Sequence, residues 1–369
     1  MKGLDLSGIR KMFELAGKDA ISFGIGEPDL DPPARAIAAY EQALRSGQNK
    51  YCPSAGIEEL RVALAAQART YWPEAQARHV VVTAGSLNGL LSTMLCFLNP
   101  GDEILVPDPG FVAYDAHPRI AGARPVPYPV RAETAFCPRP EDIAERITPK
   151  TKAIVVNSPS NPTGGVLTEA AADGIAEVAE DKGLLVISDE AYDRFSYDAP
   201  HVSMLGRAKD LIYLNTFSKT YAMTGWRLGW IVASGTHAEV LRRMNYQMVA
   251  SPPTPTQYAA LAALEGPQDD VARMVAMFKQ RRDLMVRRLQ GLPHVRVVPP
   301  RGAFYVFPRL DLPGGDEAIA HEILKRGLVT IPGSSFGPGG AGHLRLSYAL
   351  PSERITQGMD ILEQFLRDH

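Results

Sequence analysis

Cysteine is scarce in this chain, with only three among its 369 residues. Cys52, Cys96 and Cys137 are odd in number and widely spaced. Such spacing excludes a dense disulfide framework and does not match the ligand pattern of a zinc site. We therefore expect reduced thiols that pack as small apolar side chains, and no metal centre.

The chain also lacks long apolar runs and blocks of one charge. No stretch is apolar for long enough to span a bilayer, and the first residues contain no run typical of a signal peptide. Lysine and arginine number 39 against 41 acidic residues, which gives a net charge of -2. We therefore expect neither nucleic acid nor a membrane as a partner, and we expect a cytoplasmic protein.

The apolar residues are arranged as short runs that alternate with helical patterns. Strand candidates are residues 79–83, 103–107, 124–130, 153–157, 184–188 and 211–215. Helical patterns separate several of them, notably residues 168–182, and this alternation predicts an α/β fold with a mostly parallel sheet covered by helices. From residue 269 a long amphipathic run precedes short strands and helices, which indicates a smaller α+β module.

The length exceeds what one hydrophobic core usually carries, so two domains are expected. We assign residues 1–45 to an N-terminal arm that joins the small domain. Residues 46–265 form the predicted large domain, and residues 266–369 form the small C-terminal α+β domain.

Small and polar residues follow four of the predicted strands. Gly85 follows the first, Asn161 follows residues 153–157, Asp189 and Tyr192 follow residues 184–188, and Lys219 follows residues 211–215. In parallel sheets, ligands bind beyond the carboxyl ends of the strands. The four positions together therefore predict one binding site.

The lysine stretch NTFSKTYAMTGWRLGW, residues 215–230, indicates carbonyl chemistry. An amine must be uncharged to form a Schiff base, and burial or a nearby cation lowers the ordinary lysine pKa of about 10.4. Arg227 could supply that cation and bind a phosphate with its forked donors, to which Thr216 and Ser218 would add hydroxyls. Taken alone, the lysine is better explained as a solvated residue of a polar loop, so the interpretation depends on partners elsewhere in the chain.

Four motifs then occur in a characteristic order: NPTG at residues 161–164, SDEAY at 188–192, SKTYAMTGWRLG at 218–229 and HLRLSYA at 343–349. With them the chain resembles the class I/II aminotransferases of the aspartate aminotransferase superfamily, which have the fold type I of pyridoxal-phosphate (PLP) enzymes. The resemblance runs from about residue 21 to the C-terminal helix. It implies pyridoxal 5'-phosphate as the cofactor and a homodimer with shared active sites.

The resemblance implies catalytic roles for Lys219, Asp189 and Tyr192. Lys219 would bind the coenzyme aldehyde covalently and then act as the general base. Asp189 would keep the ring nitrogen protonated, so that the ring accepts electrons. Asn161 and Tyr192 would donate hydrogen bonds to the ring oxygen, and Phe111 would stack on the ring.

The other implied contacts hold the coenzyme phosphate and the substrate. The phosphate would be held by Ala84, Gly85, Ser86, Thr216, Ser218 and Arg227. Tyr51 would reach the phosphate in the other subunit. Arg345 would clamp the substrate α-carboxylate, with Asn161 and the Gly26 backbone beside it.

Leu87 bears on the choice of substrate, because some relatives specific for acidic substrates have a lysine there. We expect aromatic or neutral L-amino acids to serve as donors at least as well as aspartate, with a 2-oxo acid such as 2-oxoglutarate as acceptor. A cation from Arg10 or Lys11 could still assist a dicarboxylate.

Two alternatives share this set of residues. A PLP-dependent C–S β-lyase or synthase on the same fold would form a keto acid without an acceptor. A non-catalytic PLP-binding regulator would usually carry a DNA-binding domain, which we do not expect before residue 21. The presence of Lys219 and Arg345 also argues against a regulator.

Overall fold

The computed structural model describes residues 12, 14, 15, 17 and 19–369. Its main feature is a seven-stranded sheet with the order β2-β8-β7-β6-β5-β3-β4. The strands are β2 (Val80–Thr83), β3 (Glu103–Asp108), β4 (Arg124–Pro129), β5 (Thr151–Asn157), β6 (Leu185–Asp189), β7 (Leu211–Thr216) and β8 (Gly229–Ala233). Strand β8 is antiparallel to both of its neighbours, and the other pairs are parallel. The prediction of a mostly parallel sheet is confirmed.

The strands carry apolar side chains on both faces. In β5, Ile154 and Val156 belong to one buried cluster, whereas Ala153 and Val155 belong to another. Helices α3 (Glu58–Ala68), α7 (Glu169–Lys182) and α10 (Thr254–Glu265) contribute to the first cluster, and α4 (Ser86–Phe97), α5 (Ala113–Ile120) and α9 (Gly235–Val249) contribute to the second. The continuous apolar runs of the sequence therefore follow from burial on both faces.

Helix α7 illustrates how the local sequence sets an element. Thr168 caps its amino end, with Oγ1 accepting a hydrogen bond from the Ala171 N–H, an interaction worth about 1 kcal/mol. Gly183 ends the helix at φ +63°, a left-handed conformation that glycine adopts without a Cβ penalty. The predicted helix at residues 168–182 therefore matches the structure to within one residue.

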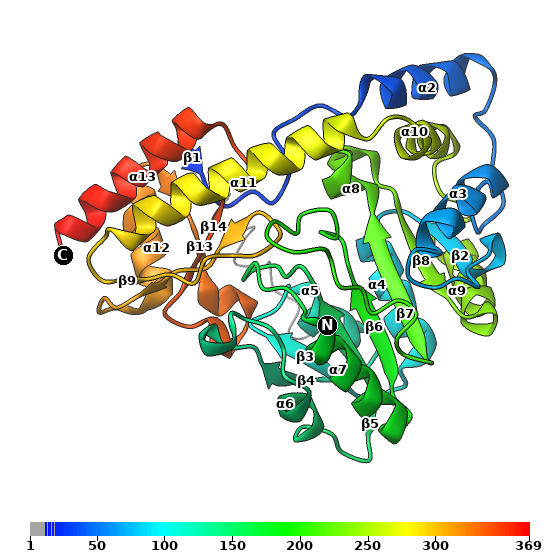
Figure 1. Cartoon of the computed structure of the whole chain (residues 1–369), viewed down its shortest axis with the longest axis horizontal. Coiled ribbons are helices and arrows are strands. Elements are labelled where there is room, and N and C mark those ends of the chain that lie inside the picture. Colours follow the sequence, from blue (N-terminus) through cyan, green and yellow to red (C-terminus); the bar gives the residue numbers. More distant parts are fainter. Residues whose placement is uncertain (1–11, 13, 16, 18) are drawn as a thin grey trace.

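A smaller assembly of short strands and helices follows the large sheet. It contains α11 (Asp269–Gln290), β9 (Val295–Arg296), β10 (Tyr305–Val306), β11 (Arg309–Leu310), α12 (Gly315–Lys325), β12 (Leu328–Val329), β13 (Ile331–Pro332), β14 (Leu344–Ser347) and α13 (Ser352–Arg367). In Figure 1, the yellow helix α11 runs from the large sheet to this part. Strand β1 (Ile21–Ser22) pairs with β12, so the N-terminal segment joins the C-terminal core.

Helix α2 (Ala34–Arg45) and the short helices α6 (Pro140–Ala144) and α8 (Phe217–Thr220) are the remaining described α-helices. Helix α2 lies against α10, where Arg35 donates to the Ala262 and Ala263 carbonyls at 3.1 Å, and Arg35 also forms an ion pair at 2.6 Å with Asp270 at the start of α11. The domain limits at residues 46 and 266 remain a prediction. Among the helices of the described residues, none combines the length and apolarity needed to cross a bilayer.

Candidate active site

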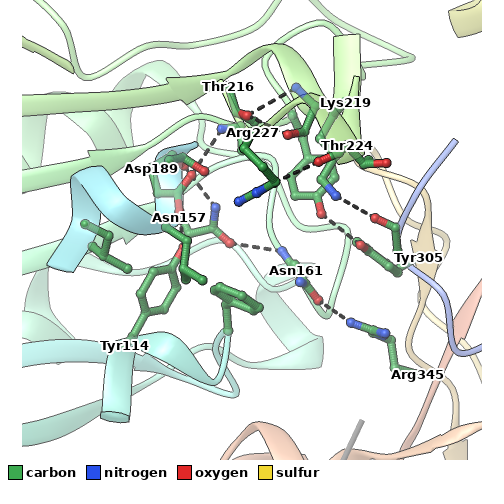
Figure 2. A pocket seen from close by; sticks show the side chains of 18 residues that line it. Tyr114, Asn157, Asn161, Asp189, Thr216, Lys219, Thr224, Arg227, Tyr305 and Arg345 are labelled. Atoms are coloured by element: carbon green, nitrogen blue, oxygen red, sulfur yellow. Dashed lines mark hydrogen bonds between the residues drawn. The ribbon is translucent and has the colours of Figure 1, made fainter. Parts of the chain in front are cut away.

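A cavity of about 270 Å³ lies at the edge of the sheet where β2, β5, β6 and β7 end (Figure 2). The predicted residues that line it are Gly26, Ser86, Phe111, Asn161, Asp189, Tyr192, Thr216, Ser218, Lys219, Arg227 and Arg345. Leu87, Leu90, Tyr114, Asn157, Ala191, Thr224 and Tyr305 complete the lining. The topology thus brings residues from four strand ends and from the C-terminal part into one cavity.

Lys219 projects into the cavity from α8. Its Nζ donates a hydrogen bond to the Gly26 carbonyl at 2.6 Å, and it lies 5.9 Å from the centre of the Tyr192 ring. Burial, aided by the charges of Arg345 and Arg227, lowers the pKa of Lys219 to about 8 against the opposing effects of Glu27 and Asp189. Arg227 therefore contributes to the shift, as the sequence predicts, but burial is the main cause.

Asp189 is the last residue of β6, and its carboxylate is buried beside the cavity. Oδ2 accepts a hydrogen bond from the Tyr114 hydroxyl at 2.9 Å, and Oδ1 accepts one from the Ala191 N–H at 3.2 Å. Burial raises the pKa of Asp189, while these two hydrogen bonds oppose the rise. A cationic ring nitrogen in the cavity would favour the ionised carboxylate.

A chain of hydrogen bonds joins β6 to the C-terminal part (Figure 2). Asn157 donates from Nδ2 to the Asp189 carbonyl at 2.9 Å, and its Oδ1 accepts from the Asn161 N–H at 2.9 Å. Asn161 in turn accepts a hydrogen bond from Arg345 Nη1 at 3.0 Å through Oδ1. This orientation leaves Nδ2 of Asn161 available as a donor to a bound ligand.

Arg345 lies on β14 and is only 2% exposed. Nη2 donates to the Gly24 carbonyl at 2.6 Å, whereas Nε has no partner among the described residues. The guanidinium lies between two rings, with Cζ at 4.6 Å from the centre of Tyr305 and 4.9 Å from that of Phe336. Burial lowers the pKa of Arg345 against opposing effects of Tyr305 and Tyr192. Its hydrogen-bond partners among the described residues are the uncharged oxygens of Asn161 and Gly24. Such a group is well suited to bind an incoming carboxylate.

Arg227 and the amino end of α4 bring a second group of N–H donors to the cavity. Gly85 precedes this helix at φ +85°, and no side chain caps the helix. The positive φ favours glycine at this position, and a Cβ there would lie 2.6 Å from Arg227 Nη2, so that the guanidinium would have to shift. Free N–H groups at a helix start and a nearby arginine together attract phosphate. Thr216 and Ser218 lie beside them, joined by a 2.9 Å hydrogen bond between their hydroxyls.

The Tyr192 hydroxyl is 2.8 Å from that of Tyr305. Burial raises the pKa of both phenols, so both stay protonated at neutral pH and can donate hydrogen bonds. Tyr305 also explains the glycine at position 26, because a Cβ there would collide with the Tyr305 hydroxyl. The backbone of Gly26 therefore lines the cavity directly.

The structure places three other predicted residues outside the cavity lining. Ala84 and Gly85 form the turn between β2 and α4, directly behind Arg227. Tyr51 is 88% exposed and does not line the cavity of its own chain. Arg10 and Lys11 lie outside the described residues.

Sequence reasoning missed Tyr114, Asn157 and Tyr305. Asn157 opens the motif NSPSNPTG, so its position before a rigid turn was the available signal. Tyr114 follows Phe111 by about one helical turn, and Tyr305 lies in an apolar strand. Both look like core aromatic residues in the sequence.

The chain matches the family model described as aminotransferase class I and II over residues 18–362. It is 38% identical to an aspartate aminotransferase of Pyrococcus horikoshii, with 98% of this chain and 94% of that protein covered. It is 37% identical to an aromatic-amino-acid aminotransferase 2 of Thermococcus litoralis, with 98% and 96% covered.

Among solved structures, the aspartate aminotransferase from Thermus thermophilus with maleate superposes with a TM-score of 0.92 at 33% identity. The superposition covers 99% of this chain and 100% of the Thermus thermophilus chain. The sequence-based resemblance and the expected fold type I are confirmed. The chain belongs to the class I and II aminotransferases, a family of PLP-dependent amino-acid aminotransferases.

Proposed function

We propose that this protein uses pyridoxal 5'-phosphate to move the amino group of an aromatic or other neutral L-amino acid, or of aspartate, to a 2-oxo acid such as 2-oxoglutarate. The observation that supports this most directly is that Lys219 and Arg345 line the same cavity. The first is an amine whose pKa is lowered to about 8, and the second is a buried guanidinium that, among the described residues, hydrogen-bonds only to uncharged oxygens.

The residues present fit the coenzyme at three points. The uncapped start of α4 and Arg227 suit the phosphate, since the cradle between them would be filled by a Cβ at Gly85. The buried Asp189 suits a protonated ring nitrogen, because a cation would offset the burial that raises its pKa. Phe111, which is half-buried in the lining, offers an aromatic face.

The coenzyme, when bound, supplies an aldehyde that accepts the amino group and a ring that accepts electrons from the substrate. Lys219 would hold the coenzyme through its amine and, when that amine is free, would take the proton from Cα of the donor and, in the second half-reaction, deliver a proton to Cα of the amino acid formed from the acceptor. Tyr192 and Nδ2 of Asn161 orient the ring by donating hydrogen bonds. Asp189 holds the proton on the ring nitrogen.

The substrate α-carboxylate is assigned to Arg345, beside Asn161 and the Gly26 backbone. The donor amino acid and the acceptor 2-oxo acid both carry this carboxylate, so one anchor serves both. The only cations among the described lining residues are Lys219, Arg227 and Arg345, and each has a role already. A second substrate carboxylate therefore lacks a partner among these residues, at a desolvation cost of several kcal/mol in a dry pocket.

Leu87 supports neutral donors, because it places an apolar side chain in the lining and is 44% exposed. An apolar donor side chain that covers it gains roughly 25 cal/mol for each Å² of apolar surface removed from water. The names of the relatives include both aspartate and aromatic amino acids, so both belong in the donor series.

A homodimer with shared active sites is part of this proposal. Tyr51 is held in place, because the Lys50 carbonyl accepts a 2.7 Å hydrogen bond from Thr254 Oγ1 and the Ser54 carbonyl accepts a 2.6 Å one from Asn245. Its own side chain is nevertheless 88% exposed. A fixed aromatic residue that points away from its own chain is typical of an interface.

The test compares kcat/KM for phenylalanine, tyrosine, methionine, alanine, aspartate and glutamate with 2-oxoglutarate as the common acceptor. Neutral and aromatic donors should match or exceed aspartate, and Leu87→Lys should shift the ratio towards aspartate. A preference for aspartate above roughly a hundredfold, or about 2.7 kcal/mol, would refute the assigned donor class. Formation of keto acid without any acceptor would instead indicate the lyase.

A further inference from the structure

Residues 24–29, which we call the cover segment, lie across the cavity without regular secondary structure. The Gly24 carbonyl accepts a 2.6 Å hydrogen bond from Arg345, and the Gly26 carbonyl accepts a 2.6 Å hydrogen bond from Lys219. Two backbone carbonyls of one segment thus contact both cations on which the proposed function depends.

The cover segment also contacts the opposite wall of the cavity. Thr224, a lining residue, donates from Oγ1 to a carboxylate oxygen of Glu27 at 2.9 Å. The segment therefore touches lining residues of the large-sheet part, Lys219 and Thr224, and of the C-terminal part, Arg345. The cover segment therefore links the two walls of the cavity through these hydrogen bonds.

The amino end of the cover segment is fixed by the C-terminal sheets. The Phe23 N–H donates to the Val329 carbonyl at 2.9 Å, and the Ser347 N–H donates to the Phe23 carbonyl at 2.6 Å. Beyond this point no strand or helix holds the backbone until α2 begins at Ala34. Holding each irregular residue in one conformation costs about 1–2 kcal/mol of conformational entropy.

The other end of the cover segment is fixed by one ion pair. Asp29 accepts two hydrogen bonds from Arg281 on α11, at 2.6 Å to Oδ1 and 2.9 Å to Oδ2. The Arg281 side chain is only 7% exposed and that of Asp29 is 19% exposed. A bidentate pair of this kind fixes orientation as well as distance, and it is shielded from salt far better than a surface pair.

We propose that the Asp29–Arg281 pair is a positioning device that anchors the cover segment to α11 and so holds the Gly24 and Gly26 carbonyls against Arg345 and Lys219. The inference rests on the proposed function, because it concerns how the substrate-binding arginine is oriented. Neither Asp29 nor Arg281 contacts the cavity, so neither is a catalytic residue.

The next residue on α11 provides a matched control. The Arg282 side chain is 9% exposed and pairs with Asp198 at 2.7 Å, and it also donates to the Pro300 carbonyl at 3.2 Å. It makes no contact with the cover segment that the structure records. A general weakening of α11 would therefore affect Arg281 and Arg282 variants alike, whereas loss of the anchor would affect only the first.

The first measurement follows cleavage by thermolysin, which cuts before large apolar residues such as Ile25 and Leu30. It uses the full chain, with and without pyridoxal phosphate. Arg281→Lys keeps the positive charge but cannot form the two parallel hydrogen bonds of a guanidinium. Asp29→Asn keeps the size of the side chain but removes its negative charge. We expect cleavage within residues 24–30 to be faster by about tenfold or more in both variants, because the anchored segment resists local opening. Arg282→Lys should be cut like the wild type.

The second measurement is steady-state transamination. Donor and acceptor share the Arg345 anchor, so both KM values should rise together in Arg281→Lys and Asp29→Asn, by about tenfold, with kcat changed by less than about threefold. The double variant should be no worse than either single variant, because the two residues act as one unit.

Wild-type cleavage rates and KM values in both single variants would overturn the proposal, and so would equal changes in Arg282→Lys. Absence of turnover in the wild-type protein would refute the proposed function alone. Cleavage rates do not depend on turnover, so in that event they would still decide for or against the anchor.

Discussion

The rate at which the coenzyme-free protein captures pyridoxal phosphate should rise with pH, with its midpoint near pH 8, and level off at higher pH. The reason is that burial, aided by the charges of Arg345 and Arg227, lowers the pKa of Lys219 from 10.5 to about 8. Only the neutral amine attacks an aldehyde. The pH dependence of capture therefore reports the environment of this one side chain.

The expected size of the effect follows from the two pKa values. At pH 7, an amine with a pKa of about 8 is neutral in roughly one molecule in ten, and an amine with the ordinary value in about one in 3,000. At equal intrinsic reactivity, the shift accelerates capture by about 300-fold at this pH. It also means that the folded chain holds this proton less tightly than the unfolded chain.

The same shift has a consequence for stability. Below pH 8 the buried ammonium destabilises the coenzyme-free fold by about 3 kcal/mol. The unfolded chain binds more protons than the folded chain between about pH 8 and 10.5, so this contribution makes the free energy of unfolding increase with pH across that window.

The assay is stopped-flow absorbance of the coenzyme between pH 6 and 10, with Lys219→Ala as the blank for the coenzyme's own titration. Arg345→Gln removes a cation that lowers the pKa of Lys219, so its midpoint should move upward. Arg309→Gln, whose side chain is 53% exposed and paired with Asp311, should leave the midpoint unchanged. A wild-type midpoint at or above pH 10, or one insensitive to Arg345→Gln, would refute the argument from burial and charge.

Further consequences can be measured on the same protein. Lys219→Ala should bind coenzyme but lose at least the roughly 10²–10⁴-fold contributed by a general base, and wild-type turnover would exclude that role. Asp189→Ala should keep its fold, as judged by circular dichroism, and lose roughly a hundredfold or more in kcat, while Tyr114→Phe should lose less because the carboxylate remains. Sedimentation at micromolar concentration should show a homodimer. Tyr51→Ala should weaken this dimer or lower its affinity for the coenzyme. A fully active monomer would contradict shared active sites.

The fold could be predicted because the apolar runs leave few alternatives. The helix expected at residues 168–182 differs from the observed α7 by one residue. Strand β4 was predicted although it contains Pro125, Pro127 and Pro129. These prolines alternate, so their missing N–H groups all lie on one side, and β4 is the last strand of its sheet, which leaves that side unpaired.

The direction of β8 could not be predicted in the same way. Its sequence, GWIVA, is as apolar as that of a parallel strand, and apolar content does not encode direction. The chain reverses direction over residues 217–228, through α8 and the 3-10 helix Thr224–Trp226, and Arg227 ends this connection in a left-handed conformation at φ +53°. That reversal places the Arg227 guanidinium at the edge where the other strands end, and no pattern in the sequence indicates it.

The site was predictable where its residues are chemically unusual, and it was missed where they are ordinary. A lysine, an aspartate and an arginine at strand ends stand out, whereas Tyr114 and Tyr305 resemble core residues. Their polar atoms matter only because folding brings them to Asp189 and Tyr192, at 2.9 Å and 2.8 Å. Such contacts join residues far apart in the chain, so they depend on the tertiary fold.

The excess of cationic side chains in the cavity lining is explained by the anionic ligands that these side chains are suited to bind. Lys219, Arg227 and Arg345 face it, whereas Asp189 is the sole carboxylate among the described lining residues. Burying an unpaired guanidinium costs several kcal/mol, and three cations in one cavity also repel one another. A phosphate at Arg227 and a carboxylate at Arg345 remove both penalties, and the repulsion itself helps keep the Lys219 amine neutral. The same arrangement that prepares the lysine for chemistry therefore demands two anions, and it leaves no described cation for a third.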